Sequence, residues 1–309
     1  MFYFDTRFPN RMAYGILHAM ENNDNNRGRL SITIHPENRQ PVYNWLEDNF
    51  SISPVETQRP QSPILQLDAY FETLLHAQIA LQVLPATLPI LHAEANELRA
   101  EEWTTFWQHH FKIEEIGRNL RIVPYWEDPP EDQRKNLIIN PGLSFGTGGH
   151  FTTRFCLEQL EIAIQQKQPK SILDAGSGSG ILSIAADKLG IEHIHAFDLD
   201  PVSIEQADAN ASRNRSPISF KTADLLNEDF YLPSADLICA NILTGVLLQA
   251  APKLIQATNL RLILSGIREI EADAVADTFI QYGAQEVSRD GDGEWCGIVL
   301  DKYLKRSPY

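Results

Sequence analysis

The stretch from Ser171 to Asp200, SILDAGSGSGILSIAADKLGIEHIHAFDLD, constrains the fold more than any other part of the chain. A short apolar run reaches Asp174, and the glycines that follow prevent a strand from continuing. Apolar residues then recur at helical spacing, and Gly190 stands where a left-handed C-terminal cap belongs. A second apolar run, His193 to Phe197, ends at Asp198. This order predicts a βαβ unit whose first loop can carry a nucleotide-like ligand.

The residue types of the loop indicate how a ligand would be held. Gly176, Gly178 and Gly180 have no Cβ, so the backbone can adopt positive φ and a ligand can lie against bare peptide groups. The carboxylate of Asp198 suits the two hydroxyls of a ribose, because it can accept both hydrogen bonds. A dinucleotide fingerprint would require a third glycine at position 181, where the chain has Ile181. The pattern is D-x-G-x-G-x-G instead, which weakens the case for a nicotinamide oxidoreductase.

Length and charge limit the classes of function. The 309 residues are 43% hydrophobic, enough for two domains with full cores, and the net charge is −15. We expect no direct nucleic-acid partner, because phosphate contacts need a basic face. An acidic surface would attract a basic polypeptide, although solubility alone explains most of such charge.

Location and metal binding can also be predicted from the sequence. The first residues do not resemble a signal peptide, and no apolar run is long enough to span a membrane. Cys156, Cys239 and Cys296 are widely spread, without metal-type pairing, which favours reduced thiols and a cytoplasmic protein. We therefore expect neither a metal site nor a membrane partner.

The N-terminal part of the chain is the hardest to interpret. Leu30 to Ile34 alternates as a strand does, and Pro41 to Phe50 is typical of a short helix. Ser51 to Ser62 is expected to be a loop, and Ile64 to Leu91 to be mostly helical with breaks at its prolines. A further helix is predicted over Glu94 to Phe111. These elements fit a small α+β module whose strand order the sequence does not give.

A second glycine-rich segment, NPGLSFGTGGHFTTRF, runs from Asn140 to Phe155. Gly142, Gly146, Gly148 and Gly149 predict an irregular loop, and Thr152 or Thr153 is suited to cap the helix that follows. The segment resembles the G-T-G-x-H-x-T-T signature of the PrmA family, the methyltransferases of bacterial ribosomal protein L11. Phe151 is a departure, since the family has a small residue or proline there.

Further motifs extend this resemblance. LDAGSGSGILSIAADKLG resembles motif I of class I S-adenosylmethionine-dependent methyltransferases, and FDLDPVSIEQADANASRN, ADLICANILTGVL, LILSGI and GEWCGIVL follow in the family's order. Together they cover roughly residues 100 to 303. In this last part Asp200 and Pro201 are suited to cap and begin a helix, and Glu286 to Lys302 is expected to form a hairpin.

The resemblance implies an α/β fold: a Rossmann-like seven-stranded class I methyltransferase sheet with a smaller N-terminal α+β domain. It implies a substrate-recognition domain at residues 1–95, a connecting region at 96–135 and an S-adenosylmethionine-binding domain at 136–309. The implied enzyme is a protein methyltransferase that modifies lysine or N-terminal amino groups, with ribosomal protein L11 as its partner. We expect a monomer.

Four cofactor contacts are implied by the resemblance: Thr153, Gly176, Asp198 and Asn241. The residues themselves independently indicate two of them, Gly176 and Asp198. A helix-start threonine such as Thr153 can equally cap its own helix. Class I enzymes often place a polar group against the adenine at the end of the third strand. Asp224 stands there, although a solvated turn residue is an equal alternative.

Two residues are candidates for the chemistry. Asn241 follows the apolar run from Asp236, at the strand tip where open α/β sheets bind ligands, and its amide can orient the lone pair of an incoming amine. His150 has the side chain of a general acid or base, but the expectation that it holds the glycine loop is stronger, since a neutral amine needs no strong base. The alternatives are a methyltransferase for another protein or a small molecule, and a cofactor-binding scaffold without turnover.

Overall fold

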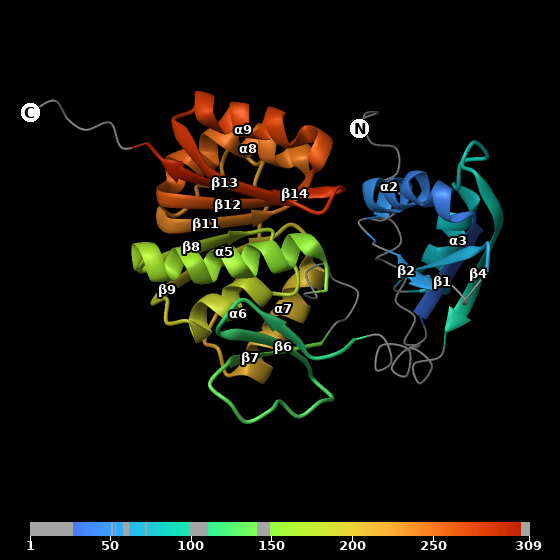
Figure 1. The fold of residues 1–309 in the computed structure, drawn as a ribbon, viewed down its shortest axis with the longest axis horizontal. Helices are drawn as coiled ribbons and strands as arrows, with labels where there is room; N and C mark the ends of the chain where they lie inside the picture. The colour runs from blue at the N-terminus through green and yellow to red at the C-terminus, as the bar shows by residue number, and fades with distance from the viewer. Residues whose placement is uncertain are drawn as a thin grey trace, which may run out of the picture. The chain divides into compact units, whose positions relative to one another are not determined.

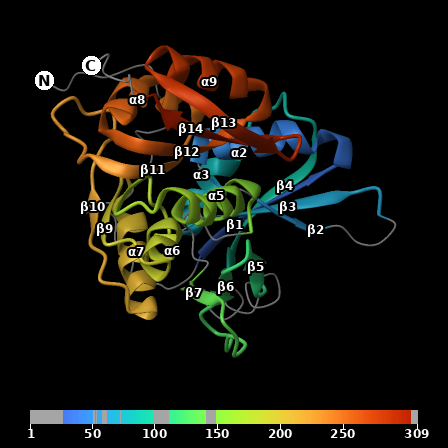
Figure 2. The same ribbon diagram turned by 60° about the vertical axis from the view of Figure 1, so that its left-hand side comes forward.

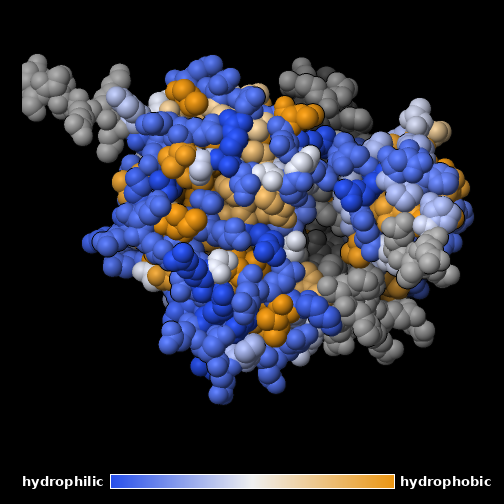
Figure 3. Space-filling model, viewed as in Figure 1, coloured by the Kyte–Doolittle hydropathy of each residue, from blue (hydrophilic) through white to orange (hydrophobic). Residues whose placement is uncertain are grey.

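The chain divides into two compact units, Met1–His109 and His110–Tyr309. The computed structural model describes residues 27–50, 52, 54–57, 62–71, 73–98, 111–140 and 149–303. Within these ranges no helix is long and apolar enough to cross a membrane. On the face seen in Figure 3, hydrophilic side chains predominate and apolar residues stand singly or in small groups.

The first unit is a four-stranded antiparallel sheet with two helices (Figure 1). Its elements are β1 (Arg27–Ile34), η1 (Pro36–Asn38), α2 (Arg39–Phe50), β2 (Val55–Thr57), β3 (Leu65–Phe71), α3 (Leu74–Gln82) and β4 (Ile90–Leu98). The sheet order β2-β3-β1-β4 with this βαββαβ sequence is the ferredoxin-like arrangement. Its core joins alternate residues of β1 and β3 to apolar residues of both helices: Leu30, Ile32, Leu67, Ala69, Val42, Leu46, Ala77 and Ala80.

Three expectations for this unit are wrong. The segment predicted as a loop contains the short strand β2, and the apolar run predicted as mostly helical begins with β3. β3 has the sequence LQLDAYF, which alternates apolar and polar residues over its first five positions, so a strand signal was present but was overlooked within the longer apolar run that includes α3. The helix predicted from Glu94 is a strand as far as Leu98, and positions 99–110 lie outside the described residues.

The second unit contains two sheets. A small one is formed by β5 (Glu114–Ile116), β6 (Leu120–Pro124) and β7 (Lys135–Ile139). The large sheet follows α5 (Phe151–Lys167). Its strands are β8 (Ser171–Ala175), β9 (His193–Asp198), β10 (Phe220–Thr222), β11 (Ala235–Asn241), β12 (Thr258–Arg268), β13 (Ala284–Gly291) and β14 (Trp295–Lys302). The helices between these strands are α6 (Ile181–Lys188), α7 (Pro201–Asn214), α8 (Thr244–Ala257), η2 (Glu269–Glu271) and α9 (Ala272–Gln281).

The order of the large sheet, β10-β9-β8-β11-β12-β14-β13, confirms the predicted seven-stranded methyltransferase sheet. β14 lies antiparallel to both β12 and β13, and together with β13 forms the predicted C-terminal hairpin, while the strands from β10 to β12 are parallel. Parallel strands bring their carboxyl ends to one edge, so β8, β9 and β11 end side by side.

Helices cover both faces of this sheet (Figures 1 and 2). Ile172, Leu237 and Ile263 pack toward α5, α6 and α7, whereas Leu173, Ile238 and Leu262 pack toward α8 and α9. Successive residues of one strand therefore enter opposite cores, as strands buried on both sides must. The three cysteines are buried and form no disulfide.

Candidate active site

The glycine loop joins β8 to α6 with three residues in the left-handed region: Gly176 (φ 81°), Gly178 (φ 50°) and Gly180 (φ 79°). A Cβ on Gly176 would lie 2.3 Å from Cγ2 of Ile242, and one on Gly180 would lie 2.8 Å from Cζ of Phe220. The expectation that glycine here exposes bare backbone needs refinement. At Gly176 and Gly180 the space of a side chain is filled by the protein itself, so these glycines let the loop pack closely against β11 and β10.

Asp198, the last residue of β9, turns its carboxylate toward this loop. Oδ2 accepts a hydrogen bond from the backbone N–H of Gly178 at 2.8 Å, and Oδ1 accepts one from Asp200 at 3.0 Å. Burial raises the pKa of Asp198, and these two backbone bonds oppose the shift. An ionised carboxylate has about four lone-pair positions, so it retains acceptor capacity for ligand hydroxyls.

Five buried side-chain atoms near the carboxyl edge of the sheet have no hydrogen-bond partner among the described residues. They belong to the first turn of α5, the end of β8, the glycine loop, the end of β11 and the start of α8: Thr153 Oγ1, Asp174 Oδ1, Ser177 Oγ, Asn241 Oδ1 and Thr244 Oγ1. Because buried polar atoms are almost always paired in folded proteins, such a group indicates a place for a polar ligand. We call these residues the unpaired edge.

Asp174 is the one acid of the unpaired edge, and it has no exposed surface. Its Oδ2 accepts hydrogen bonds from Ser183, at 3.2 Å from the backbone N and 2.6 Å from Oγ, whereas Oδ1 has no partner in the described structure. Burial raises the pKa of Asp174 to about 6. Asp174 was not predicted as a candidate site residue, although it opens the D-x-G-x-G-x-G pattern.

The residue that caps α5 is His150, so the cap predicted at Thr152 or Thr153 is wrong. His150 Nδ1 accepts the backbone N–H of Thr152 at 3.4 Å and lies 2.8 Å from the Oγ1 of Thr152. Its ring packs edge-on against Trp295, with centroids 5.3 Å apart, and burial lowers the pKa of His150. The other predicted loop glycines, Gly142, Gly146 and Gly148, lie outside the described residues.

Asn241 and Asp224 occupy different surroundings. The Nδ2 of Asn241 donates to Oγ1 of Thr152 at 3.3 Å, which brings the end of β11 to the start of α5. Asp224 is exposed in a turn, where its Oδ1 accepts the backbone N–H of Leu226 at 2.9 Å. The structure therefore brings Asn241, Thr153 and Gly176 to the ends of adjacent elements and leaves Asp224 at their margin.

Comparisons with known proteins identify the family. The family model for ribosomal protein L11 methyltransferase (PrmA) matches residues 16–303. The chain belongs to the PrmA family. It is 35% identical over 257 residues to the ribosomal protein L11 methyltransferase of Legionella pneumophila (strain Lens), covering 82% of this chain and 83% of that protein. It is 37% identical over 275 residues to the one of Pseudomonas paraeruginosa (strain PA7), covering 88% and 89%.

A solved structure agrees with this assignment. The ribosomal protein L11 methylase of Lactobacillus delbrueckii subsp. bulgaricus is 32% identical, with a TM-score of 0.56, and the match covers 63% of this chain and 100% of that one. As a PrmA-family member with a class I sheet, the protein is an S-adenosylmethionine-dependent protein methyltransferase.

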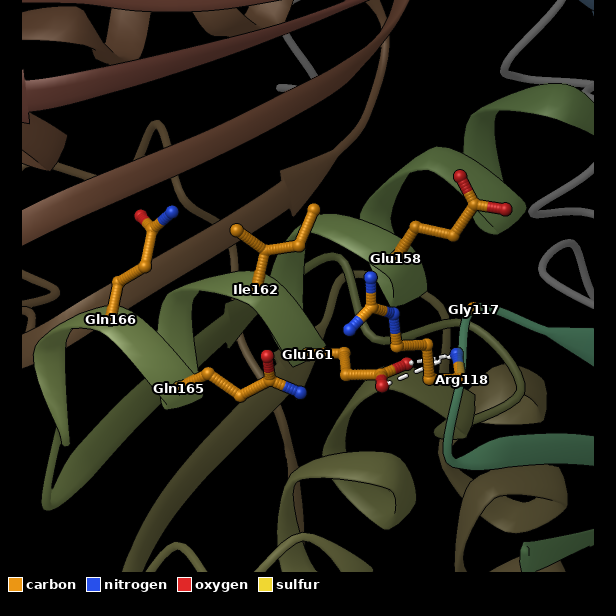
Figure 4. Close-up of a pocket in the computed structure, with 7 residues that line it drawn as sticks. All are labelled: Gly117, Arg118, Glu158, Glu161, Ile162, Gln165 and Gln166. Atoms are coloured by element: carbon orange, nitrogen blue, oxygen red, sulfur yellow. Dashed lines mark hydrogen bonds between the residues drawn. The ribbon is translucent and has the colours of Figure 1, made fainter.

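A surface hollow of this PrmA-family chain lies away from the unpaired edge, between the outer face of α5 and the β5–β6 turn (Figure 4). It is lined by Gly117, Arg118, Glu158, Glu161, Ile162, Gln165 and Gln166. The buried carboxylate of Glu161 accepts the backbone N–H of Arg118 with both oxygens, at 3.2 and 3.0 Å, and also the Nδ2 of Asn119. Glu161 therefore holds a turn, and the hollow lacks unpaired buried groups that would indicate a ligand.

Proposed function

We propose that this PrmA-family enzyme transfers methyl groups to amino groups of ribosomal protein L11, on lysine side chains, the N-terminus or both. The names of its relatives support the choice of protein. The observation that carries the chemistry is Asn241 Oδ1, a buried acceptor without a partner at the carboxyl end of β11. An amine N–H can donate to such an atom.

The residues of the unpaired edge fit S-adenosylmethionine. When bound, this cofactor supplies an activated methyl group on a sulfonium. Asp198 would accept hydrogen bonds from the ribose hydroxyls, in addition to those it accepts from the backbone. The unpaired Oδ1 of Asp174 suits a cationic group such as the ammonium of the amino acid part.

The remaining predicted contacts complete the proposed cofactor site. Gly176, Gly178 and Gly180 shape the loop, Thr153 and Asn241 offer unpaired oxygens, and Asp224 stands near the expected place of the adenine. Together with Asp174 and Asp198, these groups come from several elements of one sheet unit. Carrying them on one shared scaffold would limit the entropy lost on binding.

Asn241 would orient the acceptor amine rather than change its charge. The Oδ1 atom can accept one amine hydrogen, so that the nitrogen lone pair points toward the methyl carbon. Holding two reactants in line is sufficient for a large part of the rate in such displacements. His150 would act structurally, because its Nδ1 already caps α5.

The direct test is an assay with purified enzyme, purified ribosomal protein L11 and S-adenosylmethionine labelled in the methyl group. We expect label in L11, and none when the amines of L11 have been acetylated beforehand. Mass spectrometry of the product then locates the modified residues. Asp198→Ala serves as the cofactor-binding control.

Other outcomes identify the alternatives. Label in a component of whole-cell lysate but not in L11 would favour a different protein or a small molecule as substrate. Cofactor binding by calorimetry with no labelled product in either sample would favour a scaffold without turnover.

A further inference from the structure

We propose that Thr152 is a positioning residue that decides which end of the Asn241 amide faces the acceptor amine. The inference rests on the proposed function, in which Asn241 Oδ1 accepts a hydrogen bond from that amine. An asparagine amide presents a donor on one side and an acceptor on the other. Only one of its two orientations can serve the reaction.

Three residues from separate parts of the fold form a chain of contacts. Asn241 ends β11, Thr152 lies in the first turn of α5, and His150 is the cap of that helix. Asn241 Nδ2 lies 3.3 Å from Thr152 Oγ1, which lies 2.8 Å from His150 Nδ1. Thr152 has no exposed surface, so water does not compete for its hydroxyl.

The direction of each hydrogen bond follows from the contacts. His150 Nδ1 faces the backbone N–H of Thr152 at 3.4 Å, and because an N–H group can only donate, we assign the tautomer in which Nδ1 carries no hydrogen. The 2.8 Å contact is then a hydrogen bond that the Thr152 hydroxyl donates to His150. With its only hydrogen used, Thr152 Oγ1 offers Asn241 a lone pair, and only the NH₂ end of the amide can bind it.

The opposite end of the amide is thereby directed away from Thr152. Asn241 Oδ1 is buried and has no partner among the described residues, so it is available as an acceptor. If the amide turned over, its oxygen would meet the lone pair of Thr152, and its NH₂ group would compete for the lone pair of the attacking nitrogen.

A neutral His150 is required for this arrangement. Burial among its neighbours lowers the pKa of His150, while Asp292 and Glu294 on the β13–β14 turn act in the opposite sense. Trp295 packs against the ring edge-on and holds its plane. The ring thus fixes the hydroxyl of Thr152, and the hydroxyl fixes Asn241.

The test combines single and double substitutions, assayed by methyl transfer to purified ribosomal protein L11. Thr152→Val removes the hydroxyl at constant shape, and we expect kcat to fall about tenfold, as loss of one hydrogen bond implies. Thr152→Ser keeps the hydroxyl and should restore kcat. In an Asn241→Ala background, Thr152→Val should cause no further loss, because Thr152 acts through Asn241.

Thr258→Val is a matched control, since Thr258 is also fully buried and donates its hydroxyl, to the carbonyl of Leu254. It should lower stability without changing kcat. A second readout is independent of the substrate: the side-chain NH₂ resonances of Asn241, assigned by their loss in Asn241→Ala. In Thr152→Val they should shift and exchange their hydrogens faster. Thr152→Ala replaces Thr152→Val if the latter does not fold.

The outcomes separate this inference from the function on which it rests. It is overturned if the kcat losses of Thr152→Val and Asn241→Ala multiply, if Thr152→Ser is as slow as Thr152→Val, or if the Asn241 resonances stay unchanged. If Asn241→Ala is inactive while Thr152→Val is fully active, the role of Thr152 fails and the proposed function stands. If the wild type does not methylate L11, the proposed function fails, and the resonances still decide the role of Thr152.

Discussion

Helix α5 carries two buried polar sites that differ in how completely they are paired. Near its middle, both carboxylate oxygens of Glu161 accept hydrogen bonds from the β5–β6 turn. In its first turn, Thr153 Oγ1 is equally buried but has no partner in the described structure. The difference separates two uses of a buried polar group. A paired one stabilises the fold, whereas an unpaired one costs stability, and several of them gathered at one edge of a sheet indicate where a ligand binds.

The same contrast extends across the sheet. Asp174, Ser177, Asn241 and Thr244 share the condition of Thr153, and all lie at the carboxyl ends of the central strands or the helices next to them. If this comparison is right, substitutions at the unpaired edge should impair methyl transfer more than folding. Substitutions at Glu161 should do the reverse.

The largest effect is expected for Asn241→Ala. We expect kcat for methyl transfer to fall on the order of 10²–10³-fold, because the amine loses its orienting acceptor. Thermal unfolding should change little. Asn259→Ala is the control, since Asn259 is exposed and bonded to Ser234 and Asp236 near the other end of β11. An equal loss of kcat in both variants would show that the unpaired edge is not special.

The next largest effect is expected for Asp174, on how the free energy of unfolding depends on pH. Its pKa is raised from 3.8 to about 6, so the folded protein binds this proton more tightly than the unfolded chain. The stability that this proton contributes is fully present below pH 3.8 and is lost as pH rises through about 6. The total loss in the free energy of unfolding is about 3 kcal/mol. In ligand-free protein, Asp174→Asn should therefore gain stability relative to wild type between pH 4 and 7. Denaturant unfolding across this range measures the difference, and a pH-independent difference would be inconsistent with a buried, unpaired carboxylate.

A smaller effect, on ligand affinity, should distinguish Asp198 from its neighbour Asp200. Asp198→Ala should weaken binding of S-adenosylhomocysteine by about tenfold to a hundredfold, the usual effect of losing hydrogen bonds to a charged group. Asp200 caps α7 through the backbone N–H groups of Val202 and Ser203, as the sequence predicts. Asp200→Ala should cost about 1 kcal/mol of stability and leave affinity unchanged. Calorimetric titration measures the affinity of both variants for S-adenosylhomocysteine. Weaker binding by Asp200→Ala than by Asp198→Ala would remove Asp198 from the site.

The smallest effect on activity is expected at Glu161. Glu161→Gln should lower the free energy of unfolding by about 1–2 kcal/mol. Both carboxylate oxygens of Glu161 accept hydrogen bonds from Arg118 and Asn119, whereas a glutamine amide has only one oxygen that can accept. Its kcat should equal that of wild type. Glu158→Gln, three residues earlier on the same helix, controls for loss of charge. A large fall in kcat for Glu161→Gln alone would show that the paired site also contributes to function.

Local patterns were sufficient to predict the parts of the fold where sequence neighbours decide the structure. The run from Ser171 to Asp200 forms β8, α6 and β9 as expected, because its turn depends on glycines and its helix on spacing. The sheet order was reached only through the family resemblance. β3 was mistaken for helix because its short alternating run, LQLDA, lies just before the longer helical run of α3.

The site was only partly predictable for a related reason. Asp198 and Asn241 stand at strand tips, which the pattern of apolar runs locates. The ring of His150, which caps α5, packs against Trp295, more than 100 positions later in the chain, and histidine is not among the preferred capping residues. Asp174 is distinguished by an oxygen without a partner, and pairing is known only once the tertiary structure is.

A crystal structure with S-adenosylhomocysteine bound tests the central claim most directly. The account predicts the ligand along the carboxyl ends of β8, β9 and β11, with ribose hydroxyls on Asp198 and ligand atoms within hydrogen-bond distance of the unpaired edge. A ligand bound elsewhere, with Asp174 Oδ1 and Asn241 Oδ1 still without partners, would contradict it.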